Sequence, residues 1–301
     1  MLVFVVLGVT FFLFFSIHLV PGDPARAFLG QEATPASIAA LHNQWGLNLP
    51  IPEQYWLYLD RLVHLNLGTS LYYQSGVVGL VAGRIPVTLL LLLYGVTGAV
   101  LISVPLALLA AVNQGRLADH VVRGLGTVGL GMPSFWIGTV LIGVFGVKVH
   151  VFPVSGYGST WPAHFWSLVL PGFTIAVSIA PTLIRSLRTK MIEILHSDYV
   201  AFAWSKGVTS TSVLLRYGLR NASIDAVTIL GINIGFLVGS TVIVENVFSL
   251  PGLGSLMLES LLDRDFPVIQ GITLIFATLV VLVYLLTDLA YAMLDPRVRL
   301  K

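Results

Sequence analysis

The chain has 301 residues, of which 56% are hydrophobic and only 10% are charged, and its formal net charge is +2. Soluble domains carry about 25% charged residues, so this composition predicts an integral membrane protein. The small net charge gives no indication of nucleic-acid binding. The absence of cysteine excludes disulfides and thiolate metal sites, and the seven histidines show no ligand spacing, so no metal site is predicted.

Six uncharged runs are long enough to cross a bilayer, because a hydrocarbon core of about 30 Å needs roughly 20 residues of helix. They cover residues 1–20, 86–112, 124–147, 165–184, 226–244 and 266–287. The runs do not alternate apolar and polar residues as barrel strands do. The predicted fold is therefore an all-α integral membrane protein with six transmembrane helices.

The first run could instead be a cleaved signal peptide, since Ala25-Arg26-Ala27 resembles a cleavage site. The run lacks a basic n-region, however, and it is long for the apolar region of a signal peptide. A retained first transmembrane helix over residues 1–20 is the favoured interpretation.

The segment 21–85 is predicted to be a small ordered insertion on the extracytoplasmic side. Thr34 and Pro35 indicate the start of a helix that ends at Gly46, and residues 52–68 indicate a second helix. Asp23 is expected either to cap or pair locally in its turn, or to contact a partner at the outer mouth.

The distribution of Lys and Arg predicts the orientation in the membrane. Two of these residues lie in the loop after the second run, six in 185–220 and three in the tail 291–301, which makes eleven on one side against five on the other. By the positive-inside rule, these segments and both termini are cytoplasmic.

Motifs for catalysis or nucleotide binding are missing or misplaced. Gly124, Gly126 and Gly129 have dinucleotide-binding spacing, but they begin an apolar run, where small residues let helices approach closely. The sequence contains no P-loop motif, so this chain is not expected to bind ATP by itself. The centres of the runs carry no charge, which disfavours an ion-coupled carrier, and no reactive set of an intramembrane enzyme is evident.

The fifth run carries Gly231, Gly235 and Gly239 at four-residue spacing. This pattern is typical of a helix-packing face, and it would also suit a face that lines a pathway of changing width. The candidate pathway-lining residues are Asn233, Gly235, Gly239, Ser240 and Thr241. For each of them, an ordinary contact between helices is the simpler alternative.

A short amphipathic helix is predicted in the basic segment between the fourth and fifth runs. Ser197 or Asp198 can cap its N-terminus, and Gly207 suits its end. Helical spacing places four residues on one face, with Val200 and Trp204 beside it. These four are Tyr199, Phe202, Ala203 and Lys206. The Thr and Ser cluster at 209–212 predicts a second short helix after the glycine.

Physical reasoning alone leaves two interpretations of this helix open. It could lie on lipid head groups as an interfacial helix, or its apolar face could enter a groove of another subunit.

The same residues resemble the coupling motif of ABC importer permeases, in the form found in the dipeptide, oligopeptide and nickel branch. That form reads D-Y-x-x-x-A-x-x-K-G followed by L-R-N-A, which matches 198–207 and 219–222. The chain departs from the general permease pattern, with Ala201 where Glu is usual and Phe202 where Ala is usual. Eight further segments resemble the branch in the same order, at 21–24, 46–55, 67–70, 131–138, 153–158, 245–254, 264–271 and 294–299.

The resemblance implies a type I ABC importer permease of the B-type, with its core at 86–290 and its coupling segment at 190–222. A second, homologous permease subunit would complete the pathway, and an extracytoplasmic binding protein would deliver peptide. Two ABC ATPase subunits would bind ATP and Mg, so no cofactor is expected in this chain. The ATPase-coupling residues would be Asp198, Tyr199, Phe202, Ala203, Lys206 and Gly207.

Asp23, Glu245 and Asp265 are the candidates for contacts at the outer mouth or with the binding protein. Nickel, haem or another small solute of the same branch are the alternatives to peptide. A stand-alone channel or secondary carrier is the alternative from a different class of protein.

Overall fold

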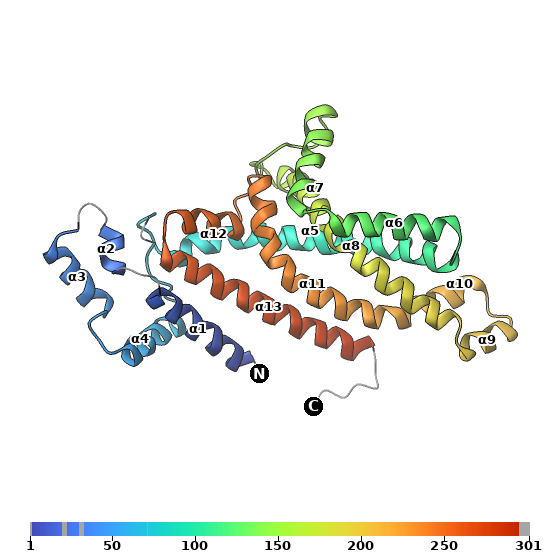
Figure 1. Cartoon of the computed structure of the whole chain (residues 1–301), viewed down its shortest axis with the longest axis horizontal. Helices are drawn as coiled ribbons and strands as arrows, with labels where there is room; N and C mark the ends of the chain where they lie inside the picture. The colour runs from blue at the N-terminus through green and yellow to red at the C-terminus, as the bar shows by residue number, and fades with distance from the viewer. Residues whose placement is uncertain (1, 20–22, 30–32, 71, 295–301) are drawn as a thin grey trace. The chain divides into compact units, whose positions relative to one another are not determined.

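The structure of the chain is a computed structural model that describes residues 2–19, 23–29, 33–70 and 72–294 (Figure 1). The chain divides into two compact units, Met1–Arg84 with Leu256–Leu279 and Ile85–Ser255 with Val280–Lys301. The described residues form helices joined by loops, with one isolated β-bridge between Thr69 and Gly76. The all-α class predicted from the apolar runs is confirmed.

The first unit contains α1 (Leu2–Leu19), α2 (Pro24–Leu29), α3 (Pro35–Trp45) and α4 (Ile51–Val63). The ends of α3 lie where the sequence predicts them. The Thr34 hydroxyl accepts a hydrogen bond from the Ser37 N–H, the Ser37 hydroxyl accepts one from the Thr34 N–H, and Gly46 has a φ of 76°. Both helices predicted within 21–85 are therefore present.

Aromatic side chains pack α4 against α1. The Tyr55 ring lies 5.7 Å from that of Phe11 and 5.3 Å from that of Phe14, measured between ring centroids. The Tyr55 hydroxyl is also 3.2 Å from Thr10 Oγ1. Tilted and edge-on rings at these separations are the favoured geometry for aromatic pairs.

The long helices follow in chain order, and most of their residues belong to the second unit. The elements are α5 (Val77–Val112), α6 (Leu117–Gly131), α7 (Ser134–Leu141), the π-helix η2 (Ile142–Lys148), α8 (Trp161–Leu195), α9 (Asp198–Ser205), α10 (Ser210–Ser212), the π-helix η3 (Val213–Leu219), α11 (Arg220–Val247), α12 (Leu253–Leu262) and α13 (Phe266–Leu294).

Within the described residues, four helices are long and apolar enough to cross a membrane. They are Val77–Val112, Trp161–Leu195, Ser210–Val247 and Phe266–Met293. A fifth span results if the bent pair Leu117–Gly131 and Ser134–Lys148 counts as one. The part of α1 with the same apolar character is Val6–Phe15, which is shorter than a span. The count of six therefore stays a prediction.

The prediction of one continuous helix over 124–147 is wrong. The chain breaks at Met132 and Pro133, and α6 and α7–η2 meet at an angle of 106°. Figure 1 shows α7 turning away from α6 at this point. Proline disfavours the helical region for the residue before it, and Met132 before Pro133 has φ −92° and ψ 121°.

The prediction of a separate second short helix after Gly207 is also wrong. The helix begins after Thr209 as expected, but α10, η3 and α11 continue one another from Ser210 to Val247. The wider π-helical turn at η3 keeps the backbone hydrogen-bonded, so nothing ends the helix near Arg220.

Two buried clusters hold the second unit together around the half of α8 that leads to α9. Ala110, Val122, Ala180 and Ile184 join α5, α6 and α8. A second cluster joins α5, α8, α9, η3 and α11, and we call it the α9 cluster. Its buried residues are Ala107, Ala111, Leu187, Met191, Ile194, Val200, Val213, Ala222 and Ala226. The helix α8 therefore packs against α6 and α11 and also carries α9 (Figure 1).

Two sets of predictions fall outside the described residues in whole or in part. The first is the tail 291–301 with the motif 294–299, where the structure describes the chain up to Leu294. The second is the turn 21–24, where the structure describes Asp23 and Pro24.

Candidate functional site

The predicted amphipathic helix is present as α9. Ser197 precedes it in an extended conformation, and the Ser197 hydroxyl donates to the Ile194 carbonyl at 2.6 Å instead of capping α9. Asp198 is in the first turn, where a carboxylate is favourable because the N-terminus of a helix is the positive end of its dipole. At the other end, the Gly207 N–H donates to the Trp204 carbonyl at 2.9 Å.

Gly207 ends α9 for a conformational reason. Its φ is 76°, in the left-handed region that glycine adopts without strain. A Cβ at this position would meet nothing within 4 Å. The backbone turn, and not a lack of space, therefore explains this glycine.

The two sides of α9 have different environments. Val200 is 0% exposed and Ala203 is 5% exposed, whereas Tyr199 is 47% exposed and Phe202 is 60% exposed. The Lys206 ammonium lies 4.5 Å above the Phe202 ring, as a cation–π pair. The prediction that Ala203 shares an exposed face with Tyr199 and Phe202 is therefore wrong: Ala203 is on the side that packs inward with Val200.

Burial of Val200 in the α9 cluster fixes α9 to its neighbours. The cluster also includes Met191 and Ile194 of α8, Val213 of η3 and Ala222 of α11. Because close-packed interiors transmit displacement, a movement of α9 is passed directly to the end of α8 and to the start of the long α10–η3–α11 helix.

The glycine repeat of α11 does not form one packing face. A Cβ on Gly231 would come within 2.6 Å of Thr287 Oγ1, and one on Gly235 would come within 3.2 Å of the Tyr284 hydroxyl, so both lie against α13. Gly239 is exposed, and a Cβ there would meet nothing within 4 Å. The three glycines drift around the axis because four residues exceed one helical turn.

The polar candidates on α11 bond to the backbone of their own helix. The Asn233 amide donates to the Ile229 carbonyl at 2.7 Å, and the Ser240 hydroxyl donates to the Leu237 carbonyl at 2.9 Å; both residues are half-buried. Thr241 is 0% exposed, and its hydroxyl donates to the Val238 carbonyl. Thr241 therefore lines no open pathway in this structure, which corrects its assignment.

Glu245 is buried instead of lying at an exposed mouth. It is 0% exposed, and it accepts hydrogen bonds from the Thr88 hydroxyl at 2.6 Å and the Ser255 N–H at 3.0 Å. The Thr88 hydroxyl in turn accepts from the Leu253 N–H at 2.8 Å. Glu245 thus holds the first turn of α12, and its expected contact with a partner is corrected to a structural role.

Asp265 needs the same correction. It is 0% exposed, and it accepts hydrogen bonds from the Ser70 hydroxyl and, at 3.2 Å, from the Tyr72 N–H. Both donors belong to the loop before α5, in the same compact unit. Asp265 therefore ties that loop to the start of α13.

Asp23 forms the local pair that was one of its two predicted roles. Its Oδ1 lies 2.8 Å from His42 Nε2 and accepts from the Ala25 N–H at 2.9 Å. The hydrogen bond with His42 holds the pKa of the Asp23 carboxyl below its usual value of 3.8. This pair joins α2 to α3.

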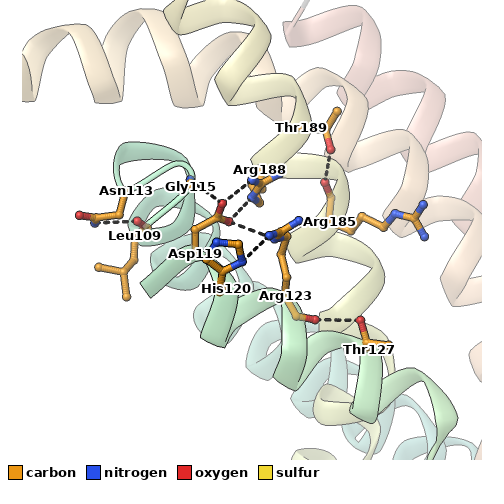
Figure 2. Close-up of polar contacts among 10 residues, drawn as sticks. All are labelled: Leu109, Asn113, Gly115, Asp119, His120, Arg123, Thr127, Arg185, Arg188 and Thr189. Carbon is orange, nitrogen blue, oxygen red and sulfur yellow. Dashed lines mark hydrogen bonds and ion pairs between the residues drawn. The ribbon is translucent and has the colours of Figure 1, made fainter. Parts of the chain in front are cut away.

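Asp119 belongs to no sequence motif described above, yet it is the centre of a polar cluster between α6 and α8 (Figure 2). A signal for it exists in the sequence, because Asp119 is the only acidic residue between Asp60 and Glu193. An isolated carboxylate beside a basic loop indicates a specific partner. Spacing could not identify that partner, Arg188, since it is 69 residues away.

Two family descriptions match the chain. The one for the "Binding-protein-dependent transport system inner membrane component" matches residues 103–300. The one for "Binding-prot-dependent transport system membrane comp, N-term" matches residues 1–92.

Curated relatives align over nearly the whole chain. The glutathione transport system permease protein GsiC of Salmonella choleraesuis (strain SC-B67) is 37% identical over 296 residues, which cover 98% of this chain and 94% of that protein. GsiC of Escherichia coli (strain K12) is 36% identical over 97% of this chain and 94% of its own length.

Among solved structures, an inward-facing conformation of the MetNI methionine ABC transporter matches with a TM-score of 0.60. The alignment covers 72% of this chain and 96% of that chain at 17% identity, so it shows a shared fold.

Proposed function

The chain belongs to the family of binding-protein-dependent transport system inner membrane components, and from this premise we propose that it forms half of the membrane pathway of an ATP-driven peptide importer. A second, homologous permease subunit supplies the other half. An extracytoplasmic binding protein delivers the substrate, and two ABC ATPase subunits bind ATP and Mg on the cytoplasmic side. The chain itself contributes no ATP site and no cofactor.

The exposed side of α9 is the proposed contact surface for the ATPase subunits. Tyr199 and Phe202 present aromatic surface of the kind that dominates protein interfaces. The opposite side of α9 is buried in the chain's own core, so force applied to the aromatic side reaches α8 and α11. Of the six coupling residues from the sequence, Ala203 acts as the anchor of α9, and Gly207 sets the turn that follows.

The substrate class follows from the relatives and from the motifs of the peptide branch. The relatives named above are glutathione transport permeases, and we extend this to small peptides for the present chain. Nickel, haem and other small solutes are the alternatives within the branch.

In the membrane, we propose the type I importer arrangement with six spans. The spans are α1, α5, the bent pair α6–α7–η2, α8, α10–η3–α11 and α13. Both termini and the coupling segment 190–222 are then cytoplasmic, and 21–85 is an extracytoplasmic insertion before the core 86–290. The tail 291–301 follows the last span. Thr241 is buried and Gly235 lies against α13, so the remaining candidates for the pathway are Asn233, Gly239 and Ser240.

The test is a charge placed on the exposed side of α9. Phe202→Asp should release the ATPase subunits when the complex is purified in mild detergent. Loss of one aromatic anchor costs about 2 kcal/mol, which is roughly a 30-fold weaker affinity. Trp204→Asp is the matched control, because Trp204 is an exposed aromatic residue about 200° around the same helix.

Two results would overturn the proposal. In the first, Phe202→Asp keeps its ATPase partners and its transport rate, so that α9 is an interfacial helix on lipid. In the second, the purified chain reconstitutes a flux without any partner, which makes it a stand-alone channel or carrier.

A further inference from the structure

The Asp119 carboxylate is held by donors from three parts of the second unit (Figure 2). It is 1% exposed. Its Oδ1 accepts from Arg188 Nε of α8 at 2.5 Å, and its Oδ2 accepts from Arg188 Nη2 at 2.7 Å. Its Oδ2 also accepts from the Gly115 N–H of the α5–α6 turn at 2.9 Å. The Nε atom of Arg123, one turn further along α6, is 3.6 Å from Oδ1.

This pair differs from an ordinary surface ion pair. The Arg188 side chain is only 17% exposed, and the bidentate geometry fixes both the distance and the orientation of the two groups. Exposed pairs contribute little to stability, whereas removal of one partner of a buried pair leaves an uncompensated charge. Asp119 and Arg188 thus define one relative position of α6 and α8.

Apolar packing between α6 and α8 does not require this pair. Val122 of α6 already packs with Ala180 and Ile184 of α8. Val122 is the α6 residue of this buried cluster, and apolar contacts are non-directional, so we expect this one side chain to allow small sliding of α6 along α8. The ion pair supplies the directional constraint that the apolar contacts lack.

Arg188 lies in α8 close to residues that belong to the two buried clusters. Ile184 belongs to the cluster shared with α6, and Leu187 belongs to the α9 cluster. The Asp119–Arg188 pair therefore lies where these two clusters meet. Whatever displaces α9 acts on one side of this part of α8, and α6 with the α5–α6 turn is attached to the other side.

From this arrangement we propose that Asp119 is a positioning residue that locks α6 to α8, so that movement of the coupling helix α9 is passed on to α6 without slippage. Asp119 touches neither substrate nor ATPase in this role. It determines how much transport results from each ATP hydrolysed. The inference rests on the proposed function, because it requires that ATPase subunits act on α9.

The experiment compares variants in the complete importer complex, reconstituted with its binding protein in proteoliposomes. The measured quantity is substrate transported per ATP hydrolysed. For Asp119→Asn and for Arg188→Gln we expect the ATPase subunits to stay bound and active. The transport ratio should fall about tenfold, within the range of about 5- to 150-fold that coupling between distant sites spans.

Arg185→Gln is the matched control. Arg185 is one turn before Arg188 on α8, it is exposed, and its side chain points away from Asp119 in Figure 2. The same charge is lost without breaking the pair, so the transport ratio should be unchanged. The double variant Asp119→Asn with Arg188→Gln should be no worse than either single variant, because residues that act as one unit are not additive.

A role limited to stability gives a different result. In that case the variants lower the thermal stability or the yield of the complex while the transport ratio stays at its original value, and the inference is overturned. An equal loss in Arg185→Gln overturns it as well. If Asp119→Asn fails to assemble, Arg188→Lys keeps the charge but removes the bidentate contact, and it should still lower the ratio.

The failures of the two proposals can be told apart. If the unaltered chain purifies without ATPase subunits, the proposed function fails and this inference fails with it. If the unaltered complex couples ATP hydrolysis to transport and Asp119→Asn couples it equally well, only this inference fails.

Discussion

At the scale of single residues, Glu245 shows how a charged group is accommodated in an apolar chain. Its two oxygens accept from the Thr88 hydroxyl and the Ser255 N–H, and Thr88 also accepts from the Leu253 N–H. These donors include N–H groups of the first turn of α12, which have no partner within their own helix. A Cβ on Gly252 would overlap both Glu245 carboxylate oxygens, so a side chain there would displace this carboxyl group.

Replacement of Glu245 should therefore destabilise the chain. Glu245→Ala leaves the Thr88 hydroxyl and the Ser255 N–H buried without this acceptor, at a cost of about 1–3 kcal/mol for each unsatisfied group. We expect a lower midpoint of thermal unfolding for the purified complex. Glu245→Gln keeps an acceptor oxygen, so its loss of stability should be smaller.

The matched control for this prediction is Glu259→Ala. Glu259 is in α12, its side chain is 48% exposed, and its ion pair with Arg84 spans 3.9 Å. An exposed pair contributes about 0–1 kcal/mol, so the midpoint should hardly change. A larger shift for Glu259→Ala than for Glu245→Ala would contradict the structural role of Glu245.

At the scale of elements, α9 is a short helix with one anchored side and one exposed side. An isolated helix of this length is not stable in water, so its helical form depends on packing. Val200 in the α9 cluster provides that packing. The aromatic side stays exposed because no described helix of this chain covers it.

This arrangement predicts opposite outcomes for two alanines of α9. Ala203→Glu would place a carboxyl group on the packed side of α9, where Ala203 is 5% exposed, at a cost of at least the roughly 2–7 kcal/mol of an unbonded neutral polar group. Ala201 is exposed two residues earlier, so Ala201→Glu should cost little. Protease digestion of membrane vesicles with an accessible cytoplasmic face should cleave the α9 region faster in Ala203→Glu only.

If both alanine variants resist the protease equally, the anchoring of α9 by its Ala203 side is refuted. The burial of Ala203 also affects how a transport defect in this variant is interpreted. A transport defect in Ala203→Glu alone would not identify a docking residue, since the side chain at this position is on the inner side of α9.

Another feature at the element scale is the break at Pro133, which turns one predicted span into two helices. The Pro133 carbonyl accepts from the Trp136 N–H at 3.0 Å, so the same residue that ends α6 also begins α7. A bent pair of this kind is compatible either with a broken span or with a segment that returns to the side from which it entered. The two cases place the following loop on opposite sides of the membrane.

At the scale of the whole molecule, the proposed topology can be tested with single cysteines, because the chain contains none. Asn48→Cys in the insertion and Ser205→Cys in α9 replace exposed residues. In intact cells, we expect an impermeant maleimide to label the first position. The second position should react only after the cytoplasmic side is opened.

Ser159→Cys, also at an exposed residue, decides the path of the bent pair. If α6, α7 and η2 cross the membrane, Ser159 is on the same side as Asn48 and is labelled in intact cells. Labelling of Ser159 only together with Ser205 would mean that the pair returns to the cytoplasmic face. The six-span arrangement would then be wrong.

The sequence by itself determined those features that depend on local composition and spacing. The apolar runs predicted an all-α membrane protein, because each helix must satisfy its own backbone in lipid. Thr34, Pro35 and Gly46 predicted the ends of α3, and Asp198 to Gly207 predicted α9 and its turn. The resemblance to peptide-branch permeases also rested on short motifs and identified the family.

Only the tertiary structure decided which side of each element is covered. Helical spacing placed Ala203 beside Phe202, but the packing of α9 against α8 and η3 leaves Ala203 5% exposed and Phe202 60% exposed. In the same way, the sequence predicts Glu245 and Asp265 at an outer mouth, whereas both are buried and accept hydrogen bonds from distant donors. Those donors are at least ten residues away in the sequence, and for Asp265 they are more than 190 away.

The Asp119–Arg188 pair gives the physical reason in its clearest form. Spacing along the sequence predicts which residues are neighbours within one helix, such as Asp119 and Arg123, which is one turn further along. It does not display which distant helix packs alongside. The partner of an isolated carboxylate is set by the packing of α6 on α8, so only the folded chain could identify Arg188.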